Sequence, residues 1–266
     1  MPEGHKTHFL ARQHSQRLGG QNVQVTSPQG RFRSDARRVS KKCLERVRAI
    51  GKHLFYDFEG GQRIHVHLGR YGSFVSQSSP PSPPRGQVRM RLIAPETTID
   101  LRGPTQCRVI DEATEQLIRD KLGPDPLAGG RKLDVWKAIS QSGKPIGALL
   151  LDQSVVAGIG NIFRAEILFE IQMDPMLRGC DMTVSEFDDL WRSTKRMMKV
   201  SLQQGRIVSV TAKEVGKPIA KLAEHERFRV YGVEDCPRCG HAITTESVAS
   251  RKLYLCPACQ GFRANR

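Results

Sequence analysis

The sequence predicts a multi-domain protein of the α+β class, and three observations predict it. Apolar residues alternate with polar ones along roughly the first 110 residues, recur at helical spacing through most of the middle, and give way near the end to two closely spaced cysteine pairs. A chain of 266 residues is long enough to bury two or three separate cores. We expect an N-terminal domain over residues 1–112, a helical domain over 113–226 and a cysteine-rich module over 227–266.

The N-terminal domain is predicted to be a mostly antiparallel β domain with one leading helix. The helix is expected from Glu3 to about Leu18, because Gly19-Gly20 then ends it. The Pro/Ser-rich stretch 77–87 is expected to be an exposed loop inside this domain, since a strand pattern resumes after it. Strands are expected at four sets of alternating apolar residues, the last with arginines on its opposite face. These sets are Val23 and Val25; Leu54, Tyr56 and Phe58; Ile64, Val66 and Leu68; and Val88, Met90 and Leu92.

After Pro104 the apolar period changes to that of helices. A first helix is expected to stop at Gly123-Pro124, and nearly all of residues 132–203 is predicted to be helical. The apolar residues at helical spacing in the first of these helices are Leu117, Ile118 and Leu122. Residues 205–227 contain few large apolar groups and many lysines, so we expect a mobile linker there.

One helix in this middle part has a recognisable start. Thr183 and Glu186 are spaced as a capping box, in which each side chain bonds the other residue's main chain. The helix that follows carries Trp191, Met197 and Met198, and we expect these three side chains in the core.

The charge balance predicts a polyanionic partner. Forty-two Lys and Arg against 27 Asp and Glu give a net charge of +15 and a pI near 9.9. Nucleic acid is the leading candidate for that partner, and a merely basic soluble protein is the alternative. No apolar run approaches the length of a membrane span and no signal-peptide segment is present at the N-terminus. We therefore expect a cytoplasmic protein that does not bind membranes.

The cysteine spacing predicts a metal site. Cys236 and Cys239 precede Cys256 and Cys259 by sixteen intervening residues, which is the pattern of two knuckles that together hold one tetrahedral Zn²⁺. Four thiolates leave no open coordination position, so this zinc would be structural. The hairpin tip between the knuckles carries Arg251. The zinc site either holds this side chain rigidly in place, or Arg251 is a solvated charge. The remaining three cysteines are scattered, which argues against a disulfide framework.

The first residues form a candidate nucleophile. Removal of Met1 would expose Pro2 as a secondary amine, and an α-amino group titrates at roughly 7.7 to 8.0 against about 10.4 for lysine. Such an amine attacks the carbonyl carbon of an opened sugar and forms an iminium. Glu3 beside it is placed to move a proton. The alternative is structural, with Pro2 as the first residue of the helix and Glu3 favourable to the helix dipole.

A glycine-containing turn forms a candidate phosphate site. Gly158 and Gly160 precede Asn161, which opens an apolar helix. Glycines allow the main chain to approach a phosphate closely, and the Asn161 amide could donate to it. The alternative is an ordinary turn in which Asn161 is the N-cap of the helix.

These motifs together resemble the formamidopyrimidine-DNA glycosylase and endonuclease VIII family, and the opening PEGH is more similar to the endonuclease VIII branch. The matching segments are MPEGH at the start, GKHLF at 51–55, HLGRYG at 67–72, LGPDPL at 122–127, LLLDQSVVAGIGNIFRAEILF at 149–169 and the closing CPRCG and SRKLYLCPACQ. The resemblance implies a catalytic β-sandwich domain, a helix-two-turns-helix DNA-binding domain and a C-terminal zinc finger. It also implies a DNA glycosylase and AP lyase of base excision repair that removes oxidised bases, chiefly pyrimidines, from double-stranded DNA.

The resemblance also implies roles for single residues. Pro2 would be the Schiff-base nucleophile, Glu3 the general acid, and Lys52 a residue that assists β-elimination and grips phosphate. Asn161 and Arg251 would bind phosphates around the flipped nucleotide, Arg251 also serving δ-elimination. The predicted DNA-binding residues further include Arg70, Tyr71 and Lys121. At this loop, relatives usually carry bulky or polar residues that fill the gap left by the flipped base. This chain has Gly69-Arg70-Tyr71 there, so Gly69 and Arg70 differ from what the family usually has.

Two other classes of function remain open at this point. A non-catalytic zinc-finger damage sensor would use the same scaffold, and a zinc-ribbon protein of the RNA machinery would explain the charge and the cysteines. The residues Pro2, Glu3 and Lys52 favour the enzyme. We expect one structural Zn²⁺ per chain, a DNA partner with oxidised or abasic sites, and a monomer associated with the bacterial nucleoid.

Overall fold

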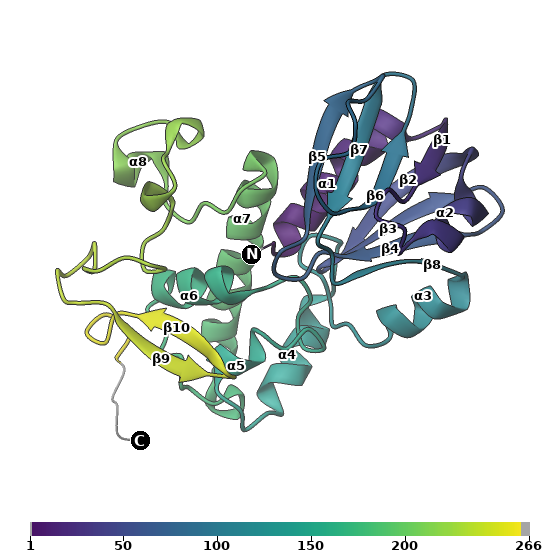
Figure 1. Ribbon diagram of the computed structural model, residues 1–266. Helices are drawn as coiled ribbons and strands as arrows, with labels where there is room; N and C mark the ends of the chain where they lie inside the picture. Colours follow the sequence, from purple (N-terminus) through teal and green to yellow (C-terminus); the bar gives the residue numbers. More distant parts are fainter. Residues whose placement is uncertain (1, 262–266) are drawn as a thin grey trace. The chain divides into compact units, whose positions relative to one another are not determined.

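The computed structural model describes residues 2–261 of the chain (Figure 1). The chain divides into two compact units, residues 1–121 and residues 122–266, which we call unit 1 and unit 2. Each unit has a hydrophobic core of its own. The finer division into three domains at residues 112 and 226 remains a prediction.

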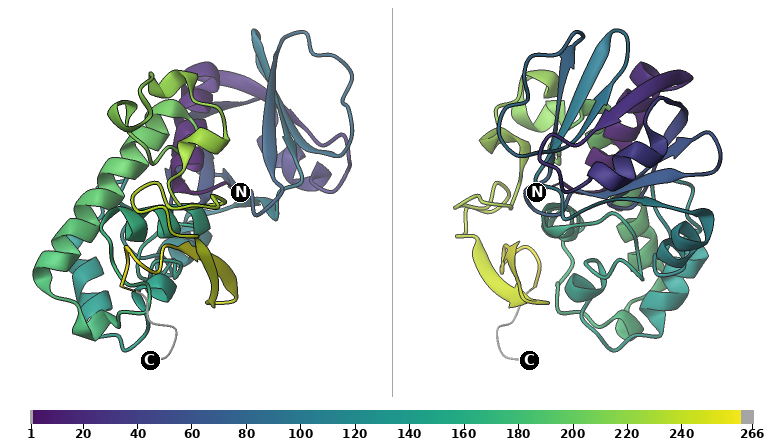
Figure 2. Two further views of the ribbon diagram at one scale, coloured as in Figure 1. Left: turned by 90° about the vertical axis from the view of Figure 1, so that its left-hand side faces the viewer. Right: turned by 45° about the vertical axis from the view of Figure 1, so that its right-hand side comes forward.

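Unit 1 is built on eight antiparallel strands in the order β5-β7-β6-β1-β2-β3-β4-β8. Figure 2 shows these strands, coloured purple to blue, from two further sides. β1 pairs with β2 through residues 21–23 and with β6 through residues 24–26, so it belongs to both halves of the sheet. Side chains from both halves pack into one core, which is the arrangement of a β-sandwich. The strands are β1 (Gln21–Thr26), β2 (Lys42–Ile50), β3 (His53–Phe58), β4 (Arg63–His67), β5 (Ser73–Ser78), β6 (Val88–Ile93), β7 (Thr97–Arg102) and β8 (Gln106–Ile110).

Three helices accompany this sheet, and most of the expected elements are confirmed. They are α1 (Gly4–Leu18), α2 (Arg33–Val39) and α3 (Glu112–Arg119). The leading helix and the strands expected from alternation correspond to α1, β1, β3, β4 and β6. Between Ser78 and Val88 the chain is mainly exposed and has no regular structure, as expected for the Pro/Ser-rich loop.

One strand lies where a change to helical period was predicted. β8 begins two residues after Pro104 and pairs along its whole length with β4, and the first helix of this region starts only at Glu112. Only Val109 and Ile110 of β8 are buried. An edge strand of five residues takes its conformation from the neighbour it bonds to, so its own apolar pattern is too short to predict it.

Several charged residues of the sheet are buried and paired with one another. Arg91 of β6 is 5% exposed and donates to both carboxylate oxygens of Asp100 at 2.6 and 2.8 Å. On β2, Arg48 bridges Asp57 of β3 and Glu115 of α3. Arg91, which alternation placed on the opposite face of its strand, is therefore part of a buried ion pair.

Unit 2 is mainly helical and ends in a β-hairpin. Its main helices are α4 (Lys132–Ser140), α5 (Ile146–Leu149), α6 (Asn161–Glu170) and α7 (Val184–Gln204). The hairpin consists of β9 (Thr244–Val248) and β10 (Arg251–Leu255). Short turns complete it: η1 (Gly179–Asp181), α8 (Ala212–Val215), η2 (Ile219–Lys221) and η3 (His225–Arg227).

The expected start and core of α7 are confirmed. The Thr183 hydroxyl accepts from the Glu186 N–H at 3.2 Å, and the Glu186 carboxylate accepts from the Thr183 N–H at 2.7 Å. Trp191 and Met198 pack in the core of unit 2.

The expectation of a mobile linker over residues 205–227 is wrong. This stretch folds around a small core of Val208, Val210 and Leu222. The Arg206 guanidinium donates to the carbonyls of Ile219, Ala220 and Leu222 at 2.8 to 3.1 Å. A single arginine thus organises a segment that has few large apolar side chains.

No helix formed by residues 2–261 has the length and apolar character that crossing a membrane requires.

Candidate active site and zinc site

The chain enters α1 through Pro2 and Glu3, which lie outside the helix. The helix begins at Gly4, and Glu3 is its N-cap with an extended backbone (φ −119°). Glu3 is fully buried, yet its carboxylate makes no capping bond to the helix. The alternative in which Pro2 is the first helical residue is therefore wrong, and Pro2 precedes the helix by two residues.

The first turn of α1 is fixed to the turn that carries Lys52. The buried Thr7 hydroxyl contacts the carbonyl oxygen of Gly51 at 2.6 Å and that of Gly4 at 2.8 Å. Gly51 has a φ of +54°, which an L-residue rarely adopts, and Lys52 follows it at the β2–β3 turn. Three predicted catalytic residues therefore come from two segments that this bond holds together in unit 1.

Two histidines beside Lys52 are functional candidates that sequence reasoning missed. Burial, with His67 and Lys52 nearby, lowers the pKa of His53 to about 4, and burial and Lys52 also lower the pKa of His67. His53 and His67 are cross-strand partners, and their ring centroids are 4.9 Å apart. Burial therefore keeps both imidazoles neutral at pH 7. The alternation of His65 and His67 along β4 was the available signal.

The loop between β4 and β5 displays Arg70 and Tyr71. Gly69 has a φ of +65°, and a Cβ there would come within 1.8 Å of the Thr105 hydroxyl. Gly72 donates its N–H to the Leu68 carbonyl at 3.0 Å, which closes the loop. Tyr71 is 77% exposed, and the Arg70 guanidinium lies 5.4 Å from its ring centroid. The loop therefore requires glycine at 69 and presents the two following side chains to solvent.

Lys121, the remaining predicted DNA-binding residue of unit 1, lies just beyond α3. It is exposed, and its N–H bonds the Ile118 carbonyl at 3.3 Å. Its role in binding DNA stays a prediction.

In unit 2, the Asn161 side chain joins α6 to the hairpin. Gly160 is the N-cap of α6, so the alternative with Asn161 as N-cap is wrong. The Asn161 amide donates to the Lys252 carbonyl at 2.8 Å, and its oxygen accepts from Arg164 at 2.6 Å. The preceding turn is held by Gln153, which accepts from the Gly158 N–H at 3.0 Å.

Arg164 is the second link between α6 and the hairpin, and sequence reasoning missed it. Its side chain is fully buried. The guanidinium donates to the carbonyls of Gly147 and Val248, both at 3.1 Å, and to that of Lys252 at 3.3 Å. Val248 ends β9 and Lys252 follows the first residue of β10, so Arg164 grips both strands next to the tip.

Arg251 begins β10 directly after that tip. The two turn residues Ala249 and Ser250 have φ values of +53° and +58°, and Val248 pairs with Arg251 across them. This is the pattern of a type I′ turn, which favours Asn-Gly. Left-handed backbone costs an L-residue roughly 1–2 kcal/mol. Arg251 also lines a hollow of about 460 Å³ together with Lys144 and Asp152.

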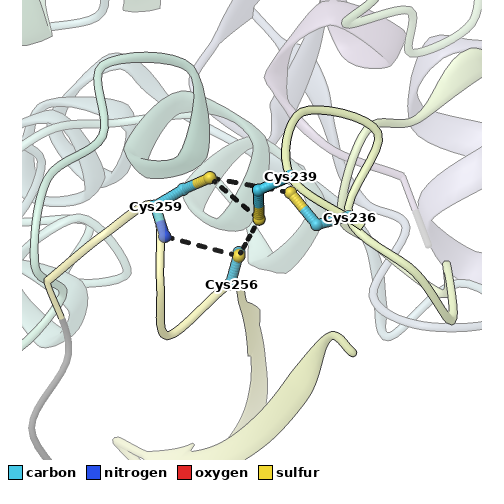
Figure 3. A group of neighbouring side chains, drawn as sticks. All are labelled: Cys236, Cys239, Cys256 and Cys259. Carbon is cyan, nitrogen blue, oxygen red and sulfur yellow. Dashed lines mark hydrogen bonds between the residues drawn. The ribbon is translucent and has the colours of Figure 1, made fainter. Parts of the chain in front are cut away.

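Four cysteine side chains converge at the far end of the hairpin (Figure 3). The sulfur atoms of Cys236, Cys239, Cys256 and Cys259 all lie within 4.8 Å of one another. Three of the S···S distances are 3.4, 3.5 and 3.7 Å. Four thiolates at about 2.3 Å from one Zn²⁺ in a tetrahedron would be about 3.8 Å apart. The cluster therefore fits a closed tetrahedral zinc site.

The cysteine module is packed against α6 and not suspended from it. Ala165 and Phe169 of α6 share a hydrophobic core with β9 and β10. Arg238, between the first two cysteines, donates to the carbonyls of Phe169 and Glu170 at 3.1 and 2.8 Å. Gln260 donates to the Met173 carbonyl at 3.0 Å. The metal site and the Arg251 tip therefore share one helical support.

Three family domains match this chain in order. Residues 1–107 match the formamidopyrimidine-DNA glycosylase N-terminal domain, residues 122–212 the formamidopyrimidine-DNA glycosylase H2TH domain, and residues 234–261 the zinc finger found in FPG and IleRS. Endonuclease 8 1 of Mycobacterium tuberculosis is 42% identical over 267 residues, which cover 98% of this chain and all of that protein. The chain belongs to the formamidopyrimidine-DNA glycosylase and endonuclease VIII family.

Other family members agree with this assignment. The formamidopyrimidine-DNA glycosylase of Thermus thermophilus is 28% identical over 240 residues, or 87% of each chain. The crystal structure of wild-type Lactococcus lactis Fpg (MutM) in complex with a DNA containing N7-benzyl-Fapy-dG has the same fold. Its TM-score is 0.81 at 21% identity, covering 97% of this chain and 99% of that one. The family consists of DNA glycosylases and AP lyases of base excision repair, and this chain is an enzyme of that class.

Proposed function

We propose that this family member removes oxidised bases, chiefly pyrimidines, through a Schiff base on Pro2 and then nicks the strand by β,δ-elimination. The observation that carries the proposal is the bond from Thr7 to the Gly51 carbonyl. It holds the chain end that carries Pro2 and Glu3 beside the turn that carries Lys52. Pro2 is only half-buried outside its helix, so an amine produced by loss of Met1 could reach a sugar.

The chemistry follows from the amine. The Pro2 nitrogen attacks C1′ and the glycosidic bond breaks, so that the base leaves with a proton, for which Glu3 is the donor. The nitrogen then loses its own proton, and its lone pair expels O4′, which takes up a proton as the sugar ring opens. The resulting iminium acidifies the C2′ proton, and its removal, assisted by Lys52, breaks the bond from C3′ to its oxygen. A second elimination breaks the bond from C5′ to its oxygen, and Arg251 favours departure of that phosphate. Hydrolysis of the imine returns the amine.

The proposed phosphate grip uses Asn161 and Arg251. An amide nitrogen has two N–H donors, and the Lys252 carbonyl takes one, so the second can bond a phosphate oxygen. This grip would supply binding energy that offsets the cost of extruding a base from the stack. Arg70, Tyr71 and Lys121 are the further DNA contacts we propose, with Tyr71 stacking in the space that the extruded base leaves.

The remaining parts of the proposal concern the metal and the partner. One structural Zn²⁺ held by the four cysteines would fix the hairpin and leave no open position for catalysis. The partner would be double-stranded DNA with oxidised or abasic sites. The protein would act as a monomer on the bacterial nucleoid, in the cytoplasm.

Trapping with sodium borohydride tests the proposal. Hydride reduces an iminium irreversibly, so protein incubated with abasic-site DNA should give a covalent adduct, and mass spectrometry should place it on Pro2. The Lys52→Gln variant is the control, because it keeps the nucleophile and should still be trapped. An adduct on a lysine, or no adduct from protein whose Met1 is removed, would contradict the proposal and favour the alternative of a non-catalytic damage sensor.

A further inference from the structure

A concentrated basic surface lies on and beside α2 in unit 1. Between residues 31 and 42 the chain has six basic residues and one acidic residue, so its formal charge there is +5 (six minus one) out of +15 overall. A third of the net charge is thus held by twelve residues. We call the six basic residues the α2 patch: Arg31, Arg33, Arg37, Arg38, Lys41 and Lys42.

The packing of α2 directs these charges outward. Ala36 and Val39 of α2 are buried in the core of unit 1, together with Phe32 just before the helix. The opposite side of the helix therefore faces solvent, and every member of the α2 patch is exposed except Lys42, which is half-buried.

The protein does little to neutralise this surface. Asp35, the one acid in the stretch, has an oxygen that accepts from the Val109 N–H at 2.9 Å. Its other oxygen lies 3.5 Å from Arg38, and among residues 2–261 this is the single ion pair that the α2 patch makes. Arg33 and Arg37 are four residues apart on the helix, a spacing at which like charges destabilise it. The repulsion between these like charges lowers the stability of the protein by itself. A bound polyanion would offset that repulsion.

One end of the α2 patch is remote from the turn that carries Lys52. Lys42 begins β2, which ends at Ile50 just before that turn, and eight steps of about 3.3 Å make roughly 26 Å. The helix itself lies beside β8, where Asp35 accepts from the Val109 N–H. Figure 1 shows α2 on the side of the sheet away from the N-terminus. The Debye length at physiological ionic strength is about 8 Å, so Lys42 at that distance has little effect on the Lys52 turn through its field. A polyanion at this end of the patch is therefore a different segment from one at the Lys52 turn.

We propose that the α2 patch binds the phosphate backbone of undamaged duplex DNA. Exposed arginines and lysines bind phosphates without reading sequence. At about 3.4 Å per base pair, 26 Å corresponds to roughly eight base pairs. The DNA is then either a distant flank of the damaged duplex or a second duplex segment. This contact is additional to the proposed catalytic function, since it requires neither a lesion nor Pro2.

Salt-dependent binding of an undamaged duplex of about 30 base pairs tests the proposal, because each lost phosphate contact reduces the salt slope by about 0.9. The patch variant is R33Q/R37Q/R38Q. The control R12Q/K195Q/K199Q removes the same charge from exposed residues on α1 and α7. We expect the patch variant to lose about two to three units of slope and at least about tenfold in affinity, and the control to lose much less.

Two further experiments distinguish a flank of the damaged duplex from a second duplex segment. If the α2 patch contacts a flank, an abasic duplex of about 12 base pairs should bind parent and patch variant equally, and one of about 30 should not. If it contacts a second segment, parent protein saturated with the short duplex should still bind a labelled long one, and the patch variant should not. Single-turnover cleavage of the short duplex at saturating protein should be the same for both proteins.

Other outcomes would overturn the proposal. A patch variant with the parental slope and affinity would do so, and so would a control that loses as much as the patch variant, because the effect would then be one of net charge. Variants that differ on vesicles of phosphatidylserine but not on DNA would assign the surface to a membrane instead. Failure of borohydride trapping would refute the Pro2 chemistry and leave these binding results unaffected.

Discussion

The side-chain amide of Asn161 donates to the main-chain carbonyl of Lys252 at 2.8 Å, which ties the first residue of α6 to the residue that follows Arg251. Arg164 reinforces the link by donating to Asn161 and to the carbonyls on both sides of the hairpin tip. The two proposed phosphate contacts of unit 2, Asn161 and Arg251, are therefore held in a fixed arrangement by one buried arginine.

Replacing Arg164 with methionine should slow cleavage, because the hairpin that carries Arg251 is then no longer held in place. Arg251→Ala should slow single-turnover cleavage of an oxidised-pyrimidine duplex by about 10- to 100-fold, or about 1.4 to 2.7 kcal/mol, and affect an abasic duplex less, because no base is extruded there. Arg164→Met should show the same selectivity. Because both changes act on one contact, the double variant should be hardly slower than Arg251→Ala. If the rate losses of the two single variants add in the double variant, Arg164 acts elsewhere. If Arg251→Ala slows cleavage of both duplexes equally, Arg251 only binds phosphate in a general way.

Loss of the metal should release the hairpin but not unfold unit 1. Chelation, or the pair Cys256→Ser and Cys259→Ser, should remove about one zinc per chain and abolish detectable DNA binding, because the cluster is the staple of a module with only a small core. Unit 1 has its own core and should keep its β-sheet signal in circular dichroism. Cys180→Ser, at an exposed cysteine outside the cluster, is the control. Full DNA binding by the metal-free protein would contradict the expectation.

Two substitutions in the turn at the hairpin tip should stabilise the hairpin. Ala249→Asn with Ser250→Gly places the residues preferred by a type I′ turn where two L-residues now have positive φ. The hairpin should gain about 1 to 2 kcal/mol in free energy of unfolding. Thermal unfolding with zinc present measures this, and cleavage rates should not change, since the contacts of Arg164 are to main-chain carbonyls outside the turn. A lower melting temperature would disprove the assigned strain.

Buried histidines should make unit 1 sensitive to acid. Burial, with Arg17 and Lys6 nearby, lowers the pKa of His14 to about 3, whereas an unfolded histidine titrates near 6.5. Between these values the unfolded chain binds a proton that the folded chain does not. The free energy of unfolding therefore falls as pH falls from about 6.5 to about 3, by about 1.4 kcal/mol per pH unit for one such group.

The His14→Gln variant isolates this contribution. Glutamine keeps a polar partner for the Tyr56 hydroxyl, which now lies 2.8 Å from the His14 ring, but does not titrate. Its melting temperature should fall less steeply than that of the parent between pH 6.5 and pH 4. His225→Gln, at an exposed position, should keep the parental slope. Identical slopes for His14→Gln and the parent would rule out a proton-linked role for His14.

The features that could be predicted from the sequence are local ones. The cysteine spacing, the capping box at Thr183 and the alternation in β3 and β4 each depend on residues a few positions apart. The resemblance to known glycosylases then placed Asn161 and Arg251 in one function, but not the bond from Asn161 to Lys252, which joins residues 91 positions apart.

What could not be predicted depends on long-range polar contacts. Arg206 folds the segment 205–227 through main-chain carbonyls, and β8 takes its conformation from β4. The same holds for the buried Arg164, whose partners are carbonyl oxygens that every residue possesses. Composition assigns such arginines to the surface, because a pattern of residue types contains no information about which main-chain groups will be left to bond.

The loop between β4 and β5 tolerates substitution at its two exposed positions but not at its two glycines. Gly69 and Gly72 leave no room for a side chain, since a Cβ would come within 1.8 Å of the Thr105 hydroxyl or 2.3 Å of the Leu68 carbonyl. The two positions between them are exposed. Natural drift or laboratory selection can therefore sample many side chains at 70 and 71 on an unchanged backbone, so the DNA contacts that we propose for this loop can diversify without loss of stability.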